Sequence, residues 1–316
     1  MNLLVSIGFQ SVQSLVLISL APILIGWMGQ NHAWLSNKSG AGLFQPYRTL
    51  HKLFLKEPVL ADNASLIFRV TPYIYFAAMC LITLIIPVFW SQLAFSAIAD
   101  VIVLIGMFAL ARIFLALAAM DIGTAFGSMG ARREMLVSFL AEPAFLMVFF
   151  NLALMNQSTS LAQMVRTTLT HSFVLNPGLA FSGIAFFMVL LAENARIPVD
   201  NPTTHLELTM IHEAMILEYS GRHLALIEWA NQLKLLNYFA IAIALFCPWG
   251  ITQTIQLTAL LSALLIFVLK LLIIGSGLSL FEVLTAKVRL FRAPEFLTSA
   301  FILAILGVLI QLMVLR

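Results

Sequence analysis

Residues 94–119 read AFSAIADVIVLIGMFALARIFLALAA, a stretch in which Asp100 and Arg112 are the only charged residues. A helix of about 20 mostly apolar residues is long enough to cross a hydrocarbon core of about 30 Å. Similar stretches lie roughly at 6–28, 70–90, 131–154, 176–193, 235–251, 255–279 and 296–315. The pattern predicts an all-α integral membrane protein with about eight transmembrane helices.

The composition supports this fold class and excludes several functions. Charged residues make up 10% of the chain and hydrophobic residues 61%, with a mean hydropathy of +1.01. That is too little polar surface for a soluble globule of this length. The two cysteines, Cys80 and Cys247, lie in apolar stretches, so we expect no metal or iron–sulfur centre held by this chain alone. The net charge of +3 gives no reason to expect a nucleic-acid partner.

Two polar regions interrupt the apolar pattern. Residues 42–57 predict an amphipathic helix lying in the membrane surface, because apolar side chains recur at helical spacing opposite three basic ones. Residues 194–234 form the longest polar stretch and are expected to be a structured cytoplasmic loop. No internal repeat or flexible linker divides residues 1–316, so a single membrane domain is expected. The surface-helix residues are Leu43, Tyr47, Leu50, Leu53 and Phe54, opposite Arg48, Lys52 and Lys56.

The positive charges predict the orientation. Most of the 17 Lys and Arg residues fall in alternate loops, and such loops remain cytoplasmic. The count places the N-terminus and the C-terminus outside, in a multi-pass protein of a prokaryotic cytoplasmic (inner) membrane. Residues 194–234 then face the cytoplasm, and the lipid bilayer itself is a partner of the chain.

Ionisable residues inside the predicted spans are the first candidates for function. Such a group costs about 2.5–3.5 kcal/mol at the bilayer centre, so it needs a partner, water or a protein interior. Asp100, Arg112, Glu142 and Lys270 are in this position. A structural alternative is that Asp100 or Glu142 neutralises Arg112 or Lys270 in a buried ion pair.

A second group of carboxylates lies near the inner ends of the spans. Carboxylates in a partly dry site can carry protons near neutral pH. The residues expected to form such a proton or coupling path are Asp121, Glu134, Glu142, Glu193 and Glu282.

The polar loop supplies further candidates. Arg196 and Arg222 are expected to pair with acidic residues of the loop, namely Asp200, Glu207, Glu213 or Glu218. His205, Glu207, His212 and Glu213 could suggest a metal site, but the H-E-x-x-H arrangement is absent, so no metal is expected there.

The chain resembles a known family at a series of colinear motifs. On these motifs it is similar to the membrane subunit shared by respiratory complex I (subunit 1, or H) and the group 4 energy-converting hydrogenases, especially the formate hydrogenlyase subunit 4 type. The motifs are 38–48 (KSGAGLFQPYR), 52–57 (KLFLKE), Asp121-Ile122-Gly123, Arg133-Glu134, Glu142-Pro143, Glu193-Asn194 with Arg196, Pro198 and Asp200, Glu207-Leu208, Glu218-Tyr219-Ser220-Gly221, and Phe281-Glu282 with Arg289.

The resemblance implies a subunit that is non-catalytic alone and belongs to an oxidoreductase complex. It implies eight transmembrane helices, a hydrophilic redox arm docked on the cytoplasmic side, and antiporter-like membrane subunits as neighbours. Iron–sulfur clusters and, in the hydrogenases, a nickel–iron centre belong to partner subunits, and this chain binds no cofactor. A cavity or loop shaped by Arg48, Arg133, Arg196, Asp200, Glu207, Glu213 and Glu218 is expected.

Several residues depart from the family pattern. Thr203 and His205 stand where acidic residues are usual, Val199 replaces Phe, and Ser39 and Ala41 replace Arg and Pro. These changes argue against quinone binding and favour a hydrogenase-like complex. The leading hypothesis is a membrane-anchor and coupling subunit that links electron transfer to proton or sodium translocation. The alternatives are a quinone-chamber subunit of a complex I-like oxidoreductase and an autonomous ion transporter.

Overall fold

A computed structural model describes residues 3–90, 99–170, 176–200, 210–252, 256–286 and 292–314. In these ranges the chain is helical, with isolated bridges as its only extended pairing, which confirms the predicted all-α class. Each predicted span falls on one helix. The helices are α1 (Leu3–Leu35), α2 (Gln45–Phe54), α3 (Leu66–Ile85), α4 (Val101–Asp121), α5 (Ala125–Asn156), α6 (Leu161–Thr170), α7 (Pro177–Glu193), α8 (His212–Ile216), α9 (Gly221–Phe246), α10 (Leu257–Leu284) and α11 (Ala293–Val314).

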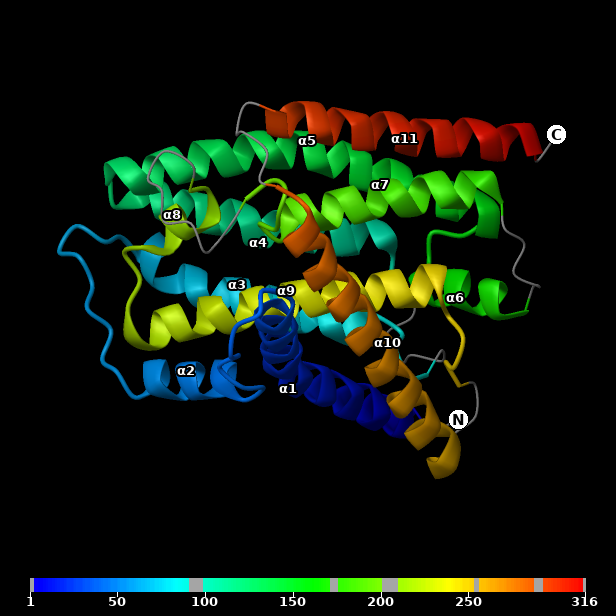
Figure 1. The fold of residues 1–316 in the computed structure, drawn as a ribbon, viewed down its shortest axis with the longest axis horizontal. Coiled ribbons are helices and arrows are strands. Elements are labelled where there is room, and N and C mark those ends of the chain that lie inside the picture. Colours follow the sequence, from blue (N-terminus) through cyan, green and yellow to red (C-terminus); the bar gives the residue numbers. More distant parts are fainter. Residues whose placement is uncertain are drawn as a thin grey trace.

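Length and composition identify the membrane helices. Six of the described helices, α1, α3, α4, α5, α10 and α11, are long and apolar enough to cross a membrane, and α7 is a shorter apolar helix. The chain is therefore a multi-pass membrane protein. In Figure 1 both termini lie at one end of the bundle, while α2 and α8 lie at the other. We call that second end the polar end, because residues 194–200 and α8 meet there.

Local sequence sets several helix starts. Ser65, Asp100, Thr124 and Asn176 each cap a helix by accepting a hydrogen bond from a backbone N–H two or three residues on. The prediction that Asp100 lies inside the membrane is therefore wrong. Asp100 is the N-cap of α4, and its Oδ2 also accepts a hydrogen bond from Thr159 at 3.1 Å.

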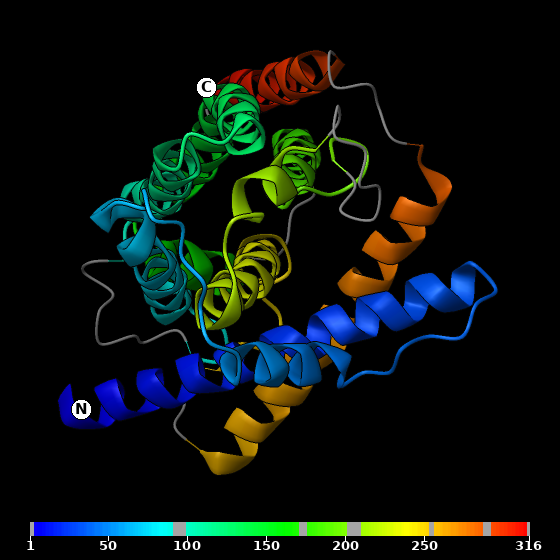
Figure 2. The ribbon, with the colours of Figure 1, turned by 90° about the vertical axis from the view of Figure 1, so that its left-hand side faces the viewer.

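The helices pack in two groups around α9. Helices α5, α7 and α11 form one group, and α3 and α4 pack on the other side of α9 (Figure 2). Small residues allow close contact between α7 and α11, since a Cβ added at Gly178 would lie 2.8 Å from the carbonyl oxygen of Gly307. Asn151 of α5 donates to the Gly178 carbonyl at 3.0 Å and to Ser182 Oγ at 2.5 Å, which joins the three helices.

Helix α9 is longer than its apolar stretch predicted. It begins at Gly221, so residues 221–234 are helix and not part of the polar loop. Its side chains are buried along most of its length, including Lys234, which is 6% exposed. The hydropathy pattern missed this part because its polar side chains face the protein interior and find partners there.

Helices α1 and α10 cross each other on one side of the bundle (Figure 2). Trp27 Nε1 and Asn31 Nδ2 of α1 both donate to Ser276 Oγ of α10, at 3.0 and 2.9 Å. Lys270 of α10 donates to the carbonyl oxygens of Cys247, at 2.6 Å, and Trp249. The suggestion that a carboxylate neutralises Lys270 is therefore wrong, because the ammonium binds the carbonyls at the end of α9, where a cation is favoured.

The predicted surface helix is confirmed as α2. Leu50 is its one buried residue, and the ring of Phe54 packs edge-on against Trp229 of α9 with centroids 6.2 Å apart. Helix α6, with ten residues, was not expected from the sequence. It follows α5 at the end opposite the polar end (Figure 1).

Candidate functional site

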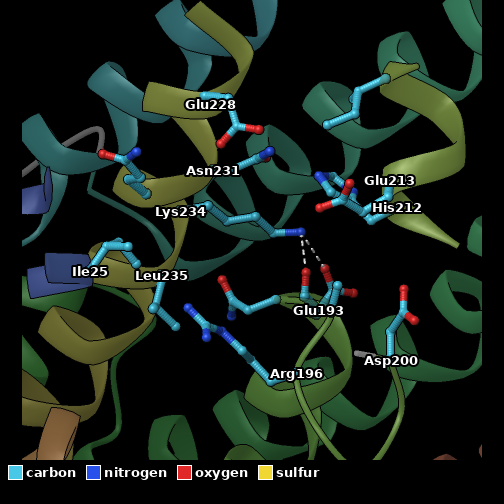
Figure 3. A pocket seen from close by; sticks show the side chains of 14 residues that line it. Ile25, Glu193, Arg196, Asp200, His212, Glu213, Glu228, Asn231, Lys234 and Leu235 are labelled. Atoms are coloured by element: carbon cyan, nitrogen blue, oxygen red, sulfur yellow. Dashed lines mark hydrogen bonds and ion pairs between the residues drawn. The ribbon is translucent and has the colours of Figure 1, made fainter. Parts of the chain in front are cut away.

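A polar cavity of about 280 Å³ opens at the polar end of the bundle. Carboxylates of Glu193, Asp200, Glu213 and Glu228 line it together with the cations Arg196 and Lys234. Figure 3 shows these side chains converging from α7, α8, α9 and the segment that follows α7. His212, Asn231, Ile25 and Leu235 complete the main part of the wall. The cavity thus holds more negative than positive groups and has room for water.

The end of α7 positions several of these residues. Ala195 adopts a left-handed backbone conformation, with φ of 49°, directly after the helix. The backbone N–H of Arg196 then donates to the carbonyl of Leu191 at 2.9 Å, which turns the chain back against α7. As a result Glu193, Arg196 and Asp200 all reach one cavity although the segment is short.

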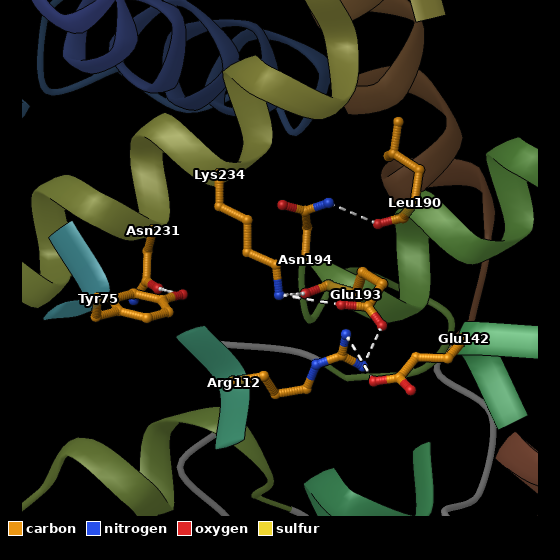
Figure 4. Close-up of polar contacts among 8 residues, drawn as sticks. All are labelled: Tyr75, Arg112, Glu142, Leu190, Glu193, Asn194, Asn231 and Lys234. Atoms are coloured by element: carbon orange, nitrogen blue, oxygen red, sulfur yellow. Dashed lines mark hydrogen bonds and ion pairs between the residues drawn. The ribbon is translucent and has the colours of Figure 1, made fainter. Parts of the chain in front are cut away.

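Glu193 is the most strongly held carboxylate of the site. It is 7% exposed, and Arg112 Nη1 of α4 donates to its Oε1 at 2.7 Å. Lys234 Nζ of α9 lies 3.2 Å from its Oε2 and donates to its main-chain carbonyl at 2.5 Å. Figure 4 shows the carboxylate between the two cations. Two neighbouring cations stabilise the ionised form, which a lone buried carboxylate could not keep.

A second cavity, of about 200 Å³, lies on the other side of Arg112. It is lined by Arg112 and Met120 of α4 and by Ser138, Phe139 and Glu142 of α5. Glu142 Oε1 lies 3.4 Å from Arg112 Nη2, and its side chain is 37% exposed, in contrast to 8% for Arg112. This ion pair confirms the predicted neutralisation of Arg112 by Glu142. Arg112 therefore contacts one carboxylate in each cavity.

The predicted path residues do not all meet. Glu134 of α5 is buried and interacts electrostatically with Lys234 and Glu193, so it belongs to the same cluster. Glu282 of α10 pairs with Arg196 at 3.3 Å. Asp121 is separate, because its Oδ2 accepts the backbone N–H of Ser65 at 2.9 Å and fixes the start of α3.

The pairing predicted for Arg196 is corrected by this contact. Arg196 was expected to pair with an acidic residue of its own loop, but the ion pair described joins it to Glu282. The reason is the turn after α7, which directs Arg196 toward α10. The loop is held in other ways, since Asp200 Oδ2 accepts the N–H of Ile211 at 3.3 Å and Arg133 donates to the Met210 carbonyl at 2.8 Å.

The remaining predicted residues divide into three groups. Glu213 lines the polar cavity, as expected. Arg48 and Glu218 are exposed and do not line it. Glu207 lies outside the described residues, as does His205, so the metal arrangement considered for this loop is not described. Within the described ranges, no group of three His, Cys, Asp or Glu side chains could hold a metal ion.

Sequence reasoning missed four members of the site: Tyr75, Glu228, Asn231 and Lys234. Tyr75 OH of α3 donates to Asn231 Oδ1 at 2.7 Å. Glu228, Asn231 and Leu235 recur at helical spacing, so extending the last predicted span toward its N-terminus would have placed them on one face. Lys234 had no such signal, because a single lysine beside a span is usually a topological charge.

His212 shows how strongly this environment acts on a titratable group. Burial, together with the nearby Lys234 ammonium, lowers the pKa of His212 from 6.5 to about 4, against an opposing effect of Asp200. The imidazole is therefore neutral at physiological pH.

The comparison with known families decides the identity of the fold. The family model described as NADH dehydrogenase matches residues 9–313. The chain belongs to this family. The NADH dehydrogenase family also contains subunits of NADH-quinone oxidoreductase, and that of Rickettsia bellii (strain OSU 85-389) is 26% identical over 61% of this chain and 57% of its own.

Two more similar members of the NADH dehydrogenase family come from Escherichia coli (strain K12). Hydrogenase-4 component C is 32% identical over 89% of this chain and 88% of its own length. Formate hydrogenlyase subunit 4 is 31% identical over 96% and 97%. These matches confirm the resemblance to the complex I and hydrogenase membrane subunits.

A solved structure shares the fold. A chain of the membrane-bound sulfane sulfur reductase, an archaeal respiratory membrane complex, superimposes with a TM-score of 0.82. The match covers 96% of this chain and 99% of that one at 17% sequence identity. At this identity the likeness establishes the fold and nothing further.

Proposed function

We propose that this chain is the membrane-anchor and coupling subunit of a multi-subunit, hydrogenase-like redox complex. The observation that carries the proposal is the position of Glu193, whose carboxylate binds Lys234 beside the polar cavity and Arg112 beside the second cavity. The chain's similarity to hydrogenase-4 component C and formate hydrogenlyase subunit 4 supports the choice of complex. Its partners are then a hydrophilic redox arm at the polar end and antiporter-like membrane subunits beside it.

The coupling step follows from competition for Arg112. A charge change or protonation in the polar cavity weakens the hold of Glu193 on Arg112, since Lys234, Asp200 and Glu193 share one small space. Arg112 then pairs more closely with Glu142, which lies only 3.4 Å away. A tighter ion pair favours the ionised form of Glu142 and releases its proton into the second cavity. Glu134, beside the same cluster, completes the path.

Iron–sulfur clusters and a nickel–iron centre are assigned to the partner subunits in this proposal, and this chain supplies no redox group. Its own residues bind the arm, hold charges at fixed positions and move protons between two cavities. The polar end faces the cytoplasm, and both termini lie on the outer side of a prokaryotic inner membrane. Proton and sodium translocation are both compatible with the site.

Two carboxylate substitutions test the function in the assembled complex. Glu193→Gln and Glu142→Gln should each lower ion-coupled turnover, and Glu57→Gln, at an exposed carboxylate beyond α2, serves as the matched control. Assembly is checked by co-purification of the redox arm with the tagged chain. Unchanged ion-coupled turnover in both variants, with assembly intact, would exclude the coupling role.

A quinone-chamber function is the second candidate. The apolar part of the polar cavity, formed by Ile25, Ile216 and Leu235, and the similarity to the NADH-quinone oxidoreductase subunit of Rickettsia bellii favour it. A quinone-site inhibitor that blocks turnover of the complex, together with quinone in the purified preparation, would establish this alternative. Absence of both results would leave the hydrogenase-like function.

A further inference from the structure

Helix α1 contains a proline where its backbone needs a donor. Pro22 lies inside α1, and proline has no N–H to give to the carbonyl four residues earlier, here that of Ile18. An unsatisfied carbonyl is costly in a membrane helix, so neighbouring groups usually bind it. In Figure 1, α1 changes direction part-way along, as expected for a proline kink.

Two side chains from other helices supply the missing donors. Trp229 Nε1 of α9 donates to the Ile18 carbonyl at 3.2 Å. Tyr47 OH of α2 donates to the carbonyl of Ser19, the next residue of the same turn. The kink is therefore completed by one residue of the central helix and one residue of the surface helix.

The same place joins α1, α2 and α9 closely. A Cβ added at Gly26 would lie 2.0 Å from the carbonyl oxygen of Leu43, so the chain leading into α2 lies directly against α1 just beyond Pro22. The Trp229 ring also packs against Phe54 of α2. A force applied to α2 is thus delivered to the kink.

The part of α1 beyond Pro22 forms a wall of the polar cavity. Ile25 lines the cavity beside Leu235 of α9 (Figure 3). Further along, Trp27 holds α10 through Ser276, and α10 carries Glu282, the partner of Arg196. A change of angle at Pro22 therefore moves two sides of the cavity, the one at Ile25 and the one at Arg196.

We propose that Pro22 is a hinge, held by Trp229 and Tyr47, through which a subunit docked on α2 sets the opening of the polar cavity. Trp229 and Tyr47 are positioning residues in this view, since they act on the cavity through α1. The inference rests on the proposed function, because that function places the redox arm against the polar end where α2 lies.

Water access to Ile25 in the assembled complex tests the hinge. The reporter is Ile25→Cys in a chain that also carries Cys80→Ala and Cys247→Ala, labelled with a water-soluble maleimide. Tyr47→Phe and Trp229→Phe remove the donor and keep an aromatic ring. Each should raise the labelling rate by about two- to tenfold, the shift expected from the loss of one hydrogen bond. Tyr73→Phe removes a hydroxyl from α3 away from α1 and should leave the rate unchanged.

Pro22→Ala gives a result that mere structural damage would not. The backbone N–H that this substitution introduces can bind the Ile18 carbonyl, so Tyr47→Phe and Trp229→Phe should have little further effect in that background. Equal labelling rates in Tyr47→Phe and Tyr73→Phe would overturn the hinge, and so would an undiminished effect in the Pro22→Ala background. If Trp229→Phe fails to assemble, Tyr47→Phe at the surface decides alone.

The labelling result is independent of the proposed coupling function. Faster labelling with unchanged ion-coupled turnover would support the hinge and contradict its connection to coupling. Unchanged labelling would overturn the hinge whatever the turnover.

Discussion

Lys234 Nζ lies 2.5 Å from the main-chain carbonyl oxygen of Glu193 and 3.2 Å from its carboxylate Oε2, although 41 positions separate the two residues. Both side chains are less than 10% exposed. A charge buried in this way is tolerated only because its partner is fixed beside it, so removing one partner exposes the full cost of the other.

The first prediction concerns this pair. Lys234→Met should destabilise the chain by about 3–5 kcal/mol, because it leaves Glu193 with one cation in the protein interior. Lys234→Arg keeps the charge and should cost clearly less. Thermal inactivation of the assembled complex in detergent measures both, and equal stability of Lys234→Met and the native complex would contradict the assignment.

A double substitution refines this test. In the variant Lys234→Met with Glu193→Gln, no uncompensated charge remains beside Arg112 except that of Glu142. The combined loss should therefore be smaller than the sum of the two single losses. Strictly additive losses would show that the two residues do not interact.

The second prediction separates the two carboxylates that bind Arg112. Glu142 is 37% exposed and lies 3.4 Å from the guanidinium, so Glu142→Gln should cost about 1 kcal/mol or less of stability. Arg112→Gln removes the partner of the buried Glu193 and should cost about 3–5 kcal/mol. The same thermal assay gives the order, and a larger loss for Glu142→Gln than for Arg112→Gln would be inconsistent with the geometry.

The third prediction concerns pH. The pKa of His212 is lowered from 6.5 to about 4, so between these values the unfolded segment binds a proton that the folded segment does not. The stability of α8 should be complete above about pH 6.5 and decrease as the pH falls toward 4. Hydrogen exchange of the amides of residues 214–216 measures it. His212→Gln should flatten the pH dependence, and an unchanged profile would argue against a buried neutral imidazole.

The fourth prediction concerns Asp100, which lies far from the polar end. As the N-cap of α4, Asp100→Ala should cost about 0.5–2 kcal/mol of stability, and Asp100→Asn much less. Neither should change ion-coupled turnover in complexes that assemble. A loss of turnover in stable Asp100→Asn complexes would place Asp100 in the ion path after all.

The sequence predicted the helices well because the bilayer imposes a minimum apolar length on each span. Even so, the polar first half of α9 was missed. Residues 221–234 carry side chains that a hydropathy pattern assigns to a loop, yet Lys234 and Asn231 are satisfied by Glu193 and Tyr75 inside the protein. Contacts between distant helices decide this, and one chain's sequence does not contain their geometry.

The site was predicted in part for the same reason. Glu193, Glu142 and Arg112 stand out because ionisable groups are rare in membrane spans, and the structure brings all three together. Asp100 and Asp121 stand out equally in the sequence but serve helix ends. Only the position of a helix boundary distinguishes the two cases, and a hydropathy pattern places that boundary only to within several residues.

The central claim is that Glu193 connects the two cavities, and the number of ions translocated per electron measures it most directly. The complex carrying Glu193→Gln is reconstituted in proteoliposomes, and ion uptake and electron transfer are recorded together. The account predicts a fall in ions per electron while the redox arm still reduces an artificial acceptor at its native rate. An unchanged ratio of ions to electrons in a fully assembled Glu193→Gln complex would contradict it.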